Sequence, residues 1–227
     1  MSVPSEPRRR IDFHSHTYLT DGANSATDMW FAADLCGHQA LAITDHVGLE
    51  DPRRILEHLA AEATAFEEGP MVTLIGVELS MLPARRIAEA ARRARAAGAE
   101  IVIVHGETLS EPVPRGTNRA ALESPDVSVL AHPGLLEPKD AELAKERGVF
   151  LELSARKGHA LANGHVARVA LEAGADLVVD SDAHAPRELL TLEAARNIAL
   201  GAGLRAEDVL RALHEGPERL LRRLGKL

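Results

Sequence analysis

The sequence contains one cysteine, Cys36, so a single chain cannot form an internal disulfide. This scarcity fits a reducing compartment and predicts a cytoplasmic protein. Residues 1–10 lack the apolar core of a secretory signal, and no run approaches the ~18 apolar residues of a membrane span. We therefore expect neither export nor membrane insertion, and we expect Cys36 to be a small buried residue of a helix.

The chain also has few aromatic residues and no excess of positive charge. The aromatic content of 3% leaves few rings on which nucleotide bases could stack. The formal net charge of −8 argues against a general nucleic-acid binder, which would present a basic face. Nucleic acid is therefore disfavoured as a partner, although a single pocket carries the opposite sign when it binds metal ions.

The chain does contain a regular alternation of apolar strands and amphipathic helices. Strands are expected at 11–16, 41–46, 72–79, 101–106, 127–134, 149–154 and 177–184. Helices are expected at 25–37, 52–68, 84–97, 118–123, 138–147, 163–174 and from 186 onward, with Ser25 and Asn163 as N-terminal caps. Unbroken apolar strands of this kind belong in a parallel sheet buried on both faces of an α/β fold. Seven strands fit either a closed barrel or an open, doubly wound sheet.

The first expected strand ends in a pair of histidines. Alternate residues of a strand point to the same face, so His14 and His16 project together and can share one metal ion. Asp12 lies on that face too, and we expect it to orient one of the imidazoles as a hydrogen-bond acceptor. An isolated pair of this kind is weak evidence for a metal site.

Histidines and carboxylates also follow most of the later strands. Nine such groups stand at strand ends or in the loops just beyond: His14, His16, Asp21, His46, Glu78, His105, His132, Asp182 and His184. The ends of all strands converge only if the sheet closes on itself, so these positions favour a seven-stranded barrel over an open sheet. Burying so many ionisable groups is costly unless metal ions neutralise them. Imidazole and carboxylate suit zinc, manganese or iron, and nine ligands would serve three ions.

No shift in composition and no flexible linker divides the chain. We therefore expect residues 1–227 to form one barrel domain. Residues 1–10 would be a basic N-terminal extension, and residues 186–227 would be helices packed on the barrel.

The nine positions also carry a family resemblance. With their neighbours they form the segments His14-Ser15-His16, Asp21-Gly22, Thr44-Asp45-His46, Gly76-Val77-Glu78, His105, Ala131-His132-Pro133 and Ser181-Asp182-Ala183-His184. In this order they resemble the motifs of the PHP (polymerase and histidinol phosphatase) family, over residues 11–188. The resemblance implies a distorted seven-stranded TIM-like α/β barrel, a trinuclear metal site and phosphoester hydrolysis.

The resemblance further implies how three ions are shared. The first ion would be held by His14, His16, Glu78 and Asp182. Glu78 would bridge to the second ion, which is also held by His105 and His132. The third ion would be held by Asp21, His46 and His184. Among these ligands, the expected catalytic residues are Glu78, Asp182 and His184.

Substrate contacts are expected from the loops beyond the strand ends. Arg156 and Lys157 follow the sixth strand, and a guanidinium forms a bidentate fork for phosphate. The loop 107–117 is longer than most connections of its kind, which predicts a functional lid. From this loop and the start of the next helix, Arg115 and Asn118 are expected to contact the substrate.

The sequence therefore predicts a histidinol-phosphatase-like enzyme that hydrolyses a small phosphomonoester by metal-activated hydroxide. Three divalent ions against three carboxylates and one hydroxide leave a local charge of about +2, which matches a phosphate dianion. Ser154 stands where many family members carry asparagine, so the resemblance does not fix the substrate. Two alternatives stay open: a PHP-type nuclease or phosphodiesterase acting on nucleic acid or nucleotides, and a non-catalytic metal-binding regulatory module.

Overall fold

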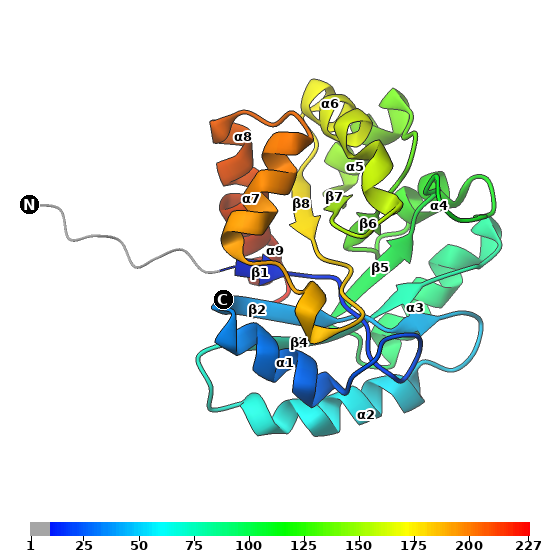
Figure 1. Ribbon diagram of the computed structural model, residues 1–227. Coiled ribbons are helices and arrows are strands. Elements are labelled where there is room, and N and C mark those ends of the chain that lie inside the picture. Colours follow the sequence, from blue (N-terminus) through cyan, green and yellow to red (C-terminus); the bar gives the residue numbers. More distant parts are fainter. Residues whose placement is uncertain (1–9) are drawn as a thin grey trace, which may run out of the picture.

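Seven parallel strands with helices between them form the fold in the computed structural model, which describes residues 10–227 (Figure 1). The seven are β1 (Arg10–Asp12), β2 (His38–Ile43), β4 (Val72–Leu79), β5 (Ile101–His105), β6 (Val129–Ala131), β7 (Phe150–Ser154) and β8 (Leu177–Asp180), and an eighth, short strand is β3 (His46–Val47). They pair in the order β1-β2-β4-β5-β6-β7-β8, and the two-residue β3, which was not expected, adds to β4. The seven expected strands are confirmed, with ends that differ by a few residues.

The sheet closes into a nearly complete barrel, as the polar strand ends predicted. Ser15 forms a parallel bridge with Ala183, and the backbone N–H of His16 donates to the Ala183 carbonyl at 2.8 Å. These contacts join the chain just after β1 to the chain just after β8. The carboxyl ends of all seven strands therefore meet at one mouth.

Charged side chains fill the seam between β1 and β8. Arg10 is 1% exposed, and its guanidinium donates to the Asp12 carboxylate at 3.0 Å and to the carbonyl of Val179. The Asp180 carboxylate accepts from the backbone N–H of Phe13 at 2.9 Å. Arg10, expected in a basic extension, is thus the buried first residue of β1. The rest of that expected extension, residues 1–9, lies outside the described residues.

The helices are α1 (Ala26–Leu35), α2 (Arg53–Ala63), α3 (Ile87–Ala96), α4 (Thr117–Glu123), α5 (Pro138–Arg147), α6 (Asn163–Ala173), α7 (Leu192–Gly201), α8 (Ala206–Leu210) and α9 (Gly216–Arg223). Ser25 caps α1 as expected, in a reciprocal capping box with Asp28. Asn163 does not cap α6, because a 3₁₀ turn leads directly into that helix. Its amide instead bonds the N–H and the carbonyl of Ser154, at 3.2 and 2.8 Å.

The helices cover the outside of the barrel and one of its ends. Helix α1 packs on β2, α2 on β4 and α6 on β7 (Figure 1). Leu220 and Leu221 of α9 join Ile11 and Phe13 in a fully buried apolar cluster of barrel residues. Helix α9 therefore packs on the barrel.

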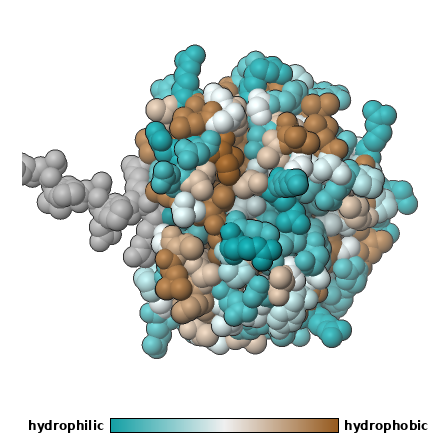
Figure 2. Space-filling model, in the orientation of Figure 1, coloured by the Kyte–Doolittle hydropathy of each residue, from teal (hydrophilic) through white to brown (hydrophobic). Residues whose placement is uncertain are grey.

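The expectation that Cys36 is buried was wrong. Cys36 is exposed, because α1 ends at Leu35 and the chain turns at Gly37, whose φ is 78°. On the face drawn in Figure 2, hydrophilic side chains separate small apolar patches. Within residues 10–227, no helix is long and apolar enough to cross a membrane.

Candidate metal centre

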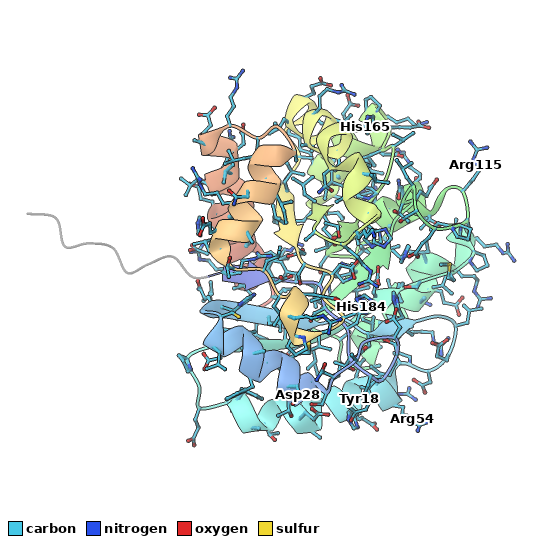
Figure 3. All side chains as sticks on the ribbon, in the orientation of Figure 1. Tyr18, Asp28, Arg54, Arg115, His165 and His184 are labelled. Atoms are coloured by element: carbon cyan, nitrogen blue, oxygen red, sulfur yellow. The ribbon has the colours of Figure 1, made fainter. Side chains whose placement is uncertain are left out.

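The nine side chains expected at strand ends do lie together at the mouth of the barrel. The pairwise contacts described below link them into one cluster, although they come from segments spread between residues 14 and 184. Figure 3 shows one of them, His184, near the middle of the fold among side chains of several elements. Barrel closure thus creates the cluster, because no two neighbouring strands alone supply it.

Glu78 lies at the centre of the cluster. Its side chain is 1% exposed, and its Oε2 lies 3.3 Å from Nε2 of His14, 3.5 Å from Nε2 of His16 and 2.9 Å from Nδ1 of His46. Its Oε1 lies 3.6 Å from Nε2 of His132. One carboxylate therefore faces imidazoles from three separate segments of the chain, which is the arrangement a bridging ligand requires.

Asp182 and Asp21 face imidazoles on either side of that centre. Oδ1 of Asp182 lies 3.3 Å from Nε2 of His16 and 3.6 Å from Nδ1 of His184. Oδ2 of Asp21 lies 3.0 Å from Nε2 of His184 and 3.5 Å from Nε2 of His46. The structure therefore groups Asp21 with the two histidines that the resemblance associated with it.

Two residues of the cluster have a left-handed backbone conformation. The φ angle is 28° at His132 and 51° at Asp182. Such angles are uncommon outside glycine and persist where the surrounding structure fixes them. His132 directly follows β6 and Asp182 is the second residue after β8, so these strained turns aim their side chains into the mouth of the barrel.

The close approach of opposite charges shifts the pKa values of the cluster. Burial by itself lowers the pKa of His14, but the carboxylates of Glu152, Glu78 and Asp182 outweigh it and raise that pKa well above its ordinary value. Burial likewise acts to raise the pKa of Glu78, and the imidazoles of His14 and His46 reverse this, so its pKa falls well below the usual range. The central carboxylate is therefore held ionised, the form that binds metal.

Glu152, inside β7, orients His14. It is fully buried, and its Oε2 accepts from the Nδ1–H of His14 at 2.7 Å, which leaves the Nε2 of that ring facing the centre of the cluster. The sequence assigned this role to Asp12, and that expectation was wrong. The Asp12 carboxylate instead accepts from the backbone N–H groups of His14 and Ser181, at 3.3 and 3.1 Å.

The donor atoms of the cluster fit divalent metal ions. Nε2 of His14, both ring nitrogens of His16 and Nδ1 of His132 are buried without a hydrogen bond of ordinary geometry to any described residue. Coordination would satisfy such atoms, which are otherwise costly to bury. Four sets of side chains offer donor atoms within 4.8 Å of one another: His16-Asp21-His46-His184, His14-His16-Asp182, His105-His132-His159 and His14-His132-Glu152. Imidazole combined with carboxylate suits zinc, manganese and iron.

The family model described as the PHP domain matches residues 12–131, more than half of the chain. The chain belongs to the PHP family. The resemblance read from the sequence is thereby confirmed. The matched segment carries the cluster residues from His14 to His105, and the barrel adds His132, Asp182 and His184 from beyond it.

The chain is also similar to one protein by sequence and to two solved structures by fold. An uncharacterized protein of Methanocaldococcus jannaschii is 39% identical over 217 residues, which cover 95% of this chain and 100% of that protein. The crystal structure of histidinol phosphate phosphatase from Lactococcus lactis, in complex with zinc, L-histidinol and phosphate, has a TM-score of 0.61 at 14% identity, covering 87% of this chain and 95% of that chain. Ochratoxinase from A. niger has a TM-score of 0.60 at 11% identity, covering 93% and 71%. At such identities the two structures show a shared barrel fold and no more.

Two of the expected substrate-binding residues lie beside the PHP cluster. Nη1 of Arg156 donates to Nδ1 of His184 at 2.7 Å, and Lys157 lines the same cavity as Arg156. Arg115 lines a separate depression and lies at the edge of the fold in Figure 3, so its contact with substrate stays a prediction. The buried amide of Asn118 bonds two backbone groups of neighbouring loops, and the structure does not direct it to the cluster.

The structure adds two side chains to the PHP site that the sequence did not assign to it. The ring of His159, on the turn after β7, stacks on His132 with centroids 4.0 Å apart. Oε2 of Glu111, in the loop after β5, lies 3.1 Å from Nε2 of His105. The length of that loop was a signal for Glu111, whereas His159 ends the segment Arg156-Lys157-Gly158-His159 that was expected to bind phosphate and was not expected to join the metal cluster.

Proposed function

We propose that this protein is a metal-dependent phosphoesterase that hydrolyses a small phosphomonoester. The observation that carries the proposal is the position of Arg156. Its guanidinium bonds His184 at 2.7 Å and lies 3.9 Å from Oδ2 of Asp182, so a fixed cation stands against the cluster of metal-binding side chains. The two groups would act together in phosphate hydrolysis, because a metal centre and a guanidinium can hold different oxygens of one phosphate.

The cavity beside Arg156 has the size of a small-molecule site. It measures about 550 Å³, and Lys157, Ser181 and Asp182 also line it. Pockets for small ligands commonly measure roughly 300–1,000 Å³. Glu111 and Glu188 line it as well, so the anionic group would bind where Arg156 and Lys157 act together with the metal ions, and the remaining volume would take the organic part of the substrate.

Bound divalent ions would act as Lewis acids on the phosphoryl group and make a water nucleophilic near neutral pH. The chain's own residues hold and orient these components. Glu152 fixes the ring of His14, Glu78 presents one carboxylate to several imidazoles, and Arg156, which contacts His184, would bind a non-bridging phosphate oxygen. The fixed geometry lowers the entropic cost of bringing phosphate and water together.

A small substrate is favoured over a nucleic acid by charge. The chain carries a net charge of −8, which repels a long polyanion along its length. A single phosphomonoester dianion experiences mainly the local field of the metal ions and Arg156. The Lactococcus lactis structure, which contains zinc, L-histidinol and phosphate, supports a phosphorylated small molecule on the same fold.

The first prediction is the order of substrates. The metal-reconstituted protein is expected to hydrolyse a phosphomonoester with a higher kcat/KM than any oligonucleotide. The measurement compares kcat/KM for p-nitrophenyl phosphate, histidinol phosphate, nucleotides and single-stranded oligonucleotides. Faster turnover of oligonucleotides, with little on any monoester, would overturn the proposal in favour of a PHP-type nuclease.

The second prediction concerns Arg156. Because a hydrogen bond to a charged group contributes about 1.5–3 kcal/mol, Arg156→Ala should weaken substrate binding by tenfold or more. At saturating metal its metal content should stay unchanged, since the guanidinium contacts the ring of His184 but is not itself a metal ligand. Arg168→Ala is the matched control, because Arg168 is an exposed α6 residue paired with Glu172 outside the cluster. Equal KM values for the Arg156 variant, the control and the wild type would remove Arg156 from the site.

A further inference from the structure

The loop between β5 and α4 is folded over the metal-binding cluster by its own hydrogen bonds. Oε1 of Glu107 accepts from the backbone N–H groups of Gly116 and Asn118, both at 3.0 Å, which closes the base of the loop. The amide of Asn118 donates to the carbonyl of Pro133 at 2.8 Å and so fixes the loop to the segment after β6. The middle of the loop is thereby placed over His105, and that position brings Glu111 to the site.

Glu111 presents its carboxylate to two imidazoles at once. Its Oε2 lies 3.1 Å from Nε2 of His105, and its Oε1 lies 3.6 Å from Nε2 of His159. The Nδ1 of His105 faces the carbonyl of Gly106 at 3.2 Å, so its Nε2 is the nitrogen free to bind a cation. Glu111 also lines the central cavity of the cluster and the two larger cavities beside it, toward Arg156 and toward Met81.

His159 is held in the manner of a metal-binding histidine. It is 5% exposed, and its Nδ1 lies 2.7 Å from Oγ1 of Thr108 and 2.9 Å from Oγ of Ser110. Fixing one ring nitrogen in this way leaves the other, Nε2, directed into the cluster, 3.8 Å from Oδ2 of Asp182. The hydroxyls that orient His159 come from the loop that carries Glu111, so one loop positions both side chains.

The spacing of these donors matches the ligands of one ion. Donor atoms of His105, His132 and His159 lie within 4.8 Å of one another, and Glu111 contacts the first and third of these rings. Zinc–nitrogen bonds of about 2.0–2.1 Å place tetrahedral ligands roughly 3.3–3.5 Å apart. The 3.1 and 3.6 Å contacts of Glu111 bracket that range; the first also has the length of an ordinary hydrogen bond, and the second is too long for one.

We propose that His159 and Glu111 are metal ligands additional to the nine strand-end positions, and that they share the ion bound by His105 and His132. The proposal rests on the metal dependence of the proposed function. His159 is the permanent ligand because it is buried and held by two hydroxyls. Glu111 is the exchangeable ligand because it is 42% exposed and borders the substrate cavities, so it can yield its position to an anion.

The test is metal retention, with variants His159→Ala and Glu111→Gln. Protein loaded with Zn²⁺ is dialysed against increasing concentrations of a chelator, and the equivalents left on each chain are measured by elemental analysis. Both variants should lose one equivalent at chelator concentrations tenfold to a hundredfold lower than the wild type, about the effect of removing a metal-supporting contact. His165→Ala is the control. That histidine lies outside the cluster, and its Nε2 bonds the Leu136 carbonyl at 2.8 Å.

A coordination role is separated from a packing role by cobalt substitution. Removing a ligand should change the visible absorption of Co²⁺-loaded protein, whereas His165→Ala should leave the spectrum unchanged. Retention curves and Co²⁺ spectra like those of the wild type in both variants would overturn the proposal. This result can be told apart from failure of the proposed function. A wild-type protein that retains metal but hydrolyses no phosphoester would contradict the proposed phosphoesterase activity and leave the assignment of His159 and Glu111 as ligands intact.

Discussion

Glu78 shows how one residue acquires its role from the fold. In the sequence it is one acidic residue at the end of an apolar strand, and its position there was enough to predict a ligand. Its contacts with imidazoles from several segments, all within 3.6 Å, follow from barrel closure. Glu152 could not be predicted in the same way. It lies within β7, where it reads as an interruption of an apolar run, and its partner His14 is 138 positions away.

The third prediction is that Glu78→Ala is the most damaging single substitution among the nine. It removes a carboxylate that faces several imidazoles, whereas Asp21→Ala removes a 51% exposed carboxylate at the rim. We expect Glu78→Ala to lose more than one equivalent of metal and to reduce kcat/KM by a larger factor than Asp21→Ala. Near-normal activity and metal content in the Glu78 variant would show that it does not bridge two ions.

At the scale of elements, the alternation of strands and helices was readable because apolar runs and helix caps are local signals. The β4 and α5 boundaries agree with those expected. Two features were missed for physical reasons: β3 has two residues and no pattern of its own, and the 3₁₀ turn at 159–162 depends on contacts with the loop after β5. The expected second strand began at Leu41, but β2 begins at His38, a residue whose polarity hid it from the apolar pattern.

His38 supplies the fourth prediction. It is fully buried at the start of β2, and Nδ1 lies 3.1 Å from the Ala33 carbonyl. Burial, with a smaller contribution from Arg10 against an opposing one from Asp12, lowers the pKa of His38 to about 4. The pKa of His38 is therefore lower in the folded than in the unfolded state. Its contribution to the free energy of unfolding is fully present above the unfolded pKa and is lost as the pH falls toward 4.

Urea unfolding at pH 7.5 and pH 5 checks this pH dependence. At about 1.4 kcal/mol per pH unit between the two pKa values, His38 should account for roughly 2 kcal/mol of the stability lost over this interval. His38→Asn keeps a donor for the Ala33 carbonyl and removes the titration, so its loss should be smaller by that amount. If the variant and the wild type lose the same free energy of unfolding between the two pH values, the pKa of His38 does not differ between the folded and the unfolded state.

At the scale of the whole molecule, the sequence predicted closure because strand-end ligands must converge, and the barrel confirms it. How the barrel closes was not predictable. The seam between β1 and β8 depends on Arg10, Asp12 and Asp180, whose contacts across it join residues 167–170 positions apart and leave no local pattern. We further propose that the chain is one domain, since the barrel includes residues from both ends of the described segment.

The central claim is that the cluster at the mouth of the barrel holds metal ions on which phosphoester hydrolysis depends. The most direct measurement is elemental analysis of the reconstituted protein, paired with its activity before and after chelation. The account predicts two to three equivalents of zinc, manganese or iron per chain. Activity should disappear on chelation and return with metal. Less than one equivalent after careful reconstitution, or hydrolysis unaffected by chelation, would contradict it.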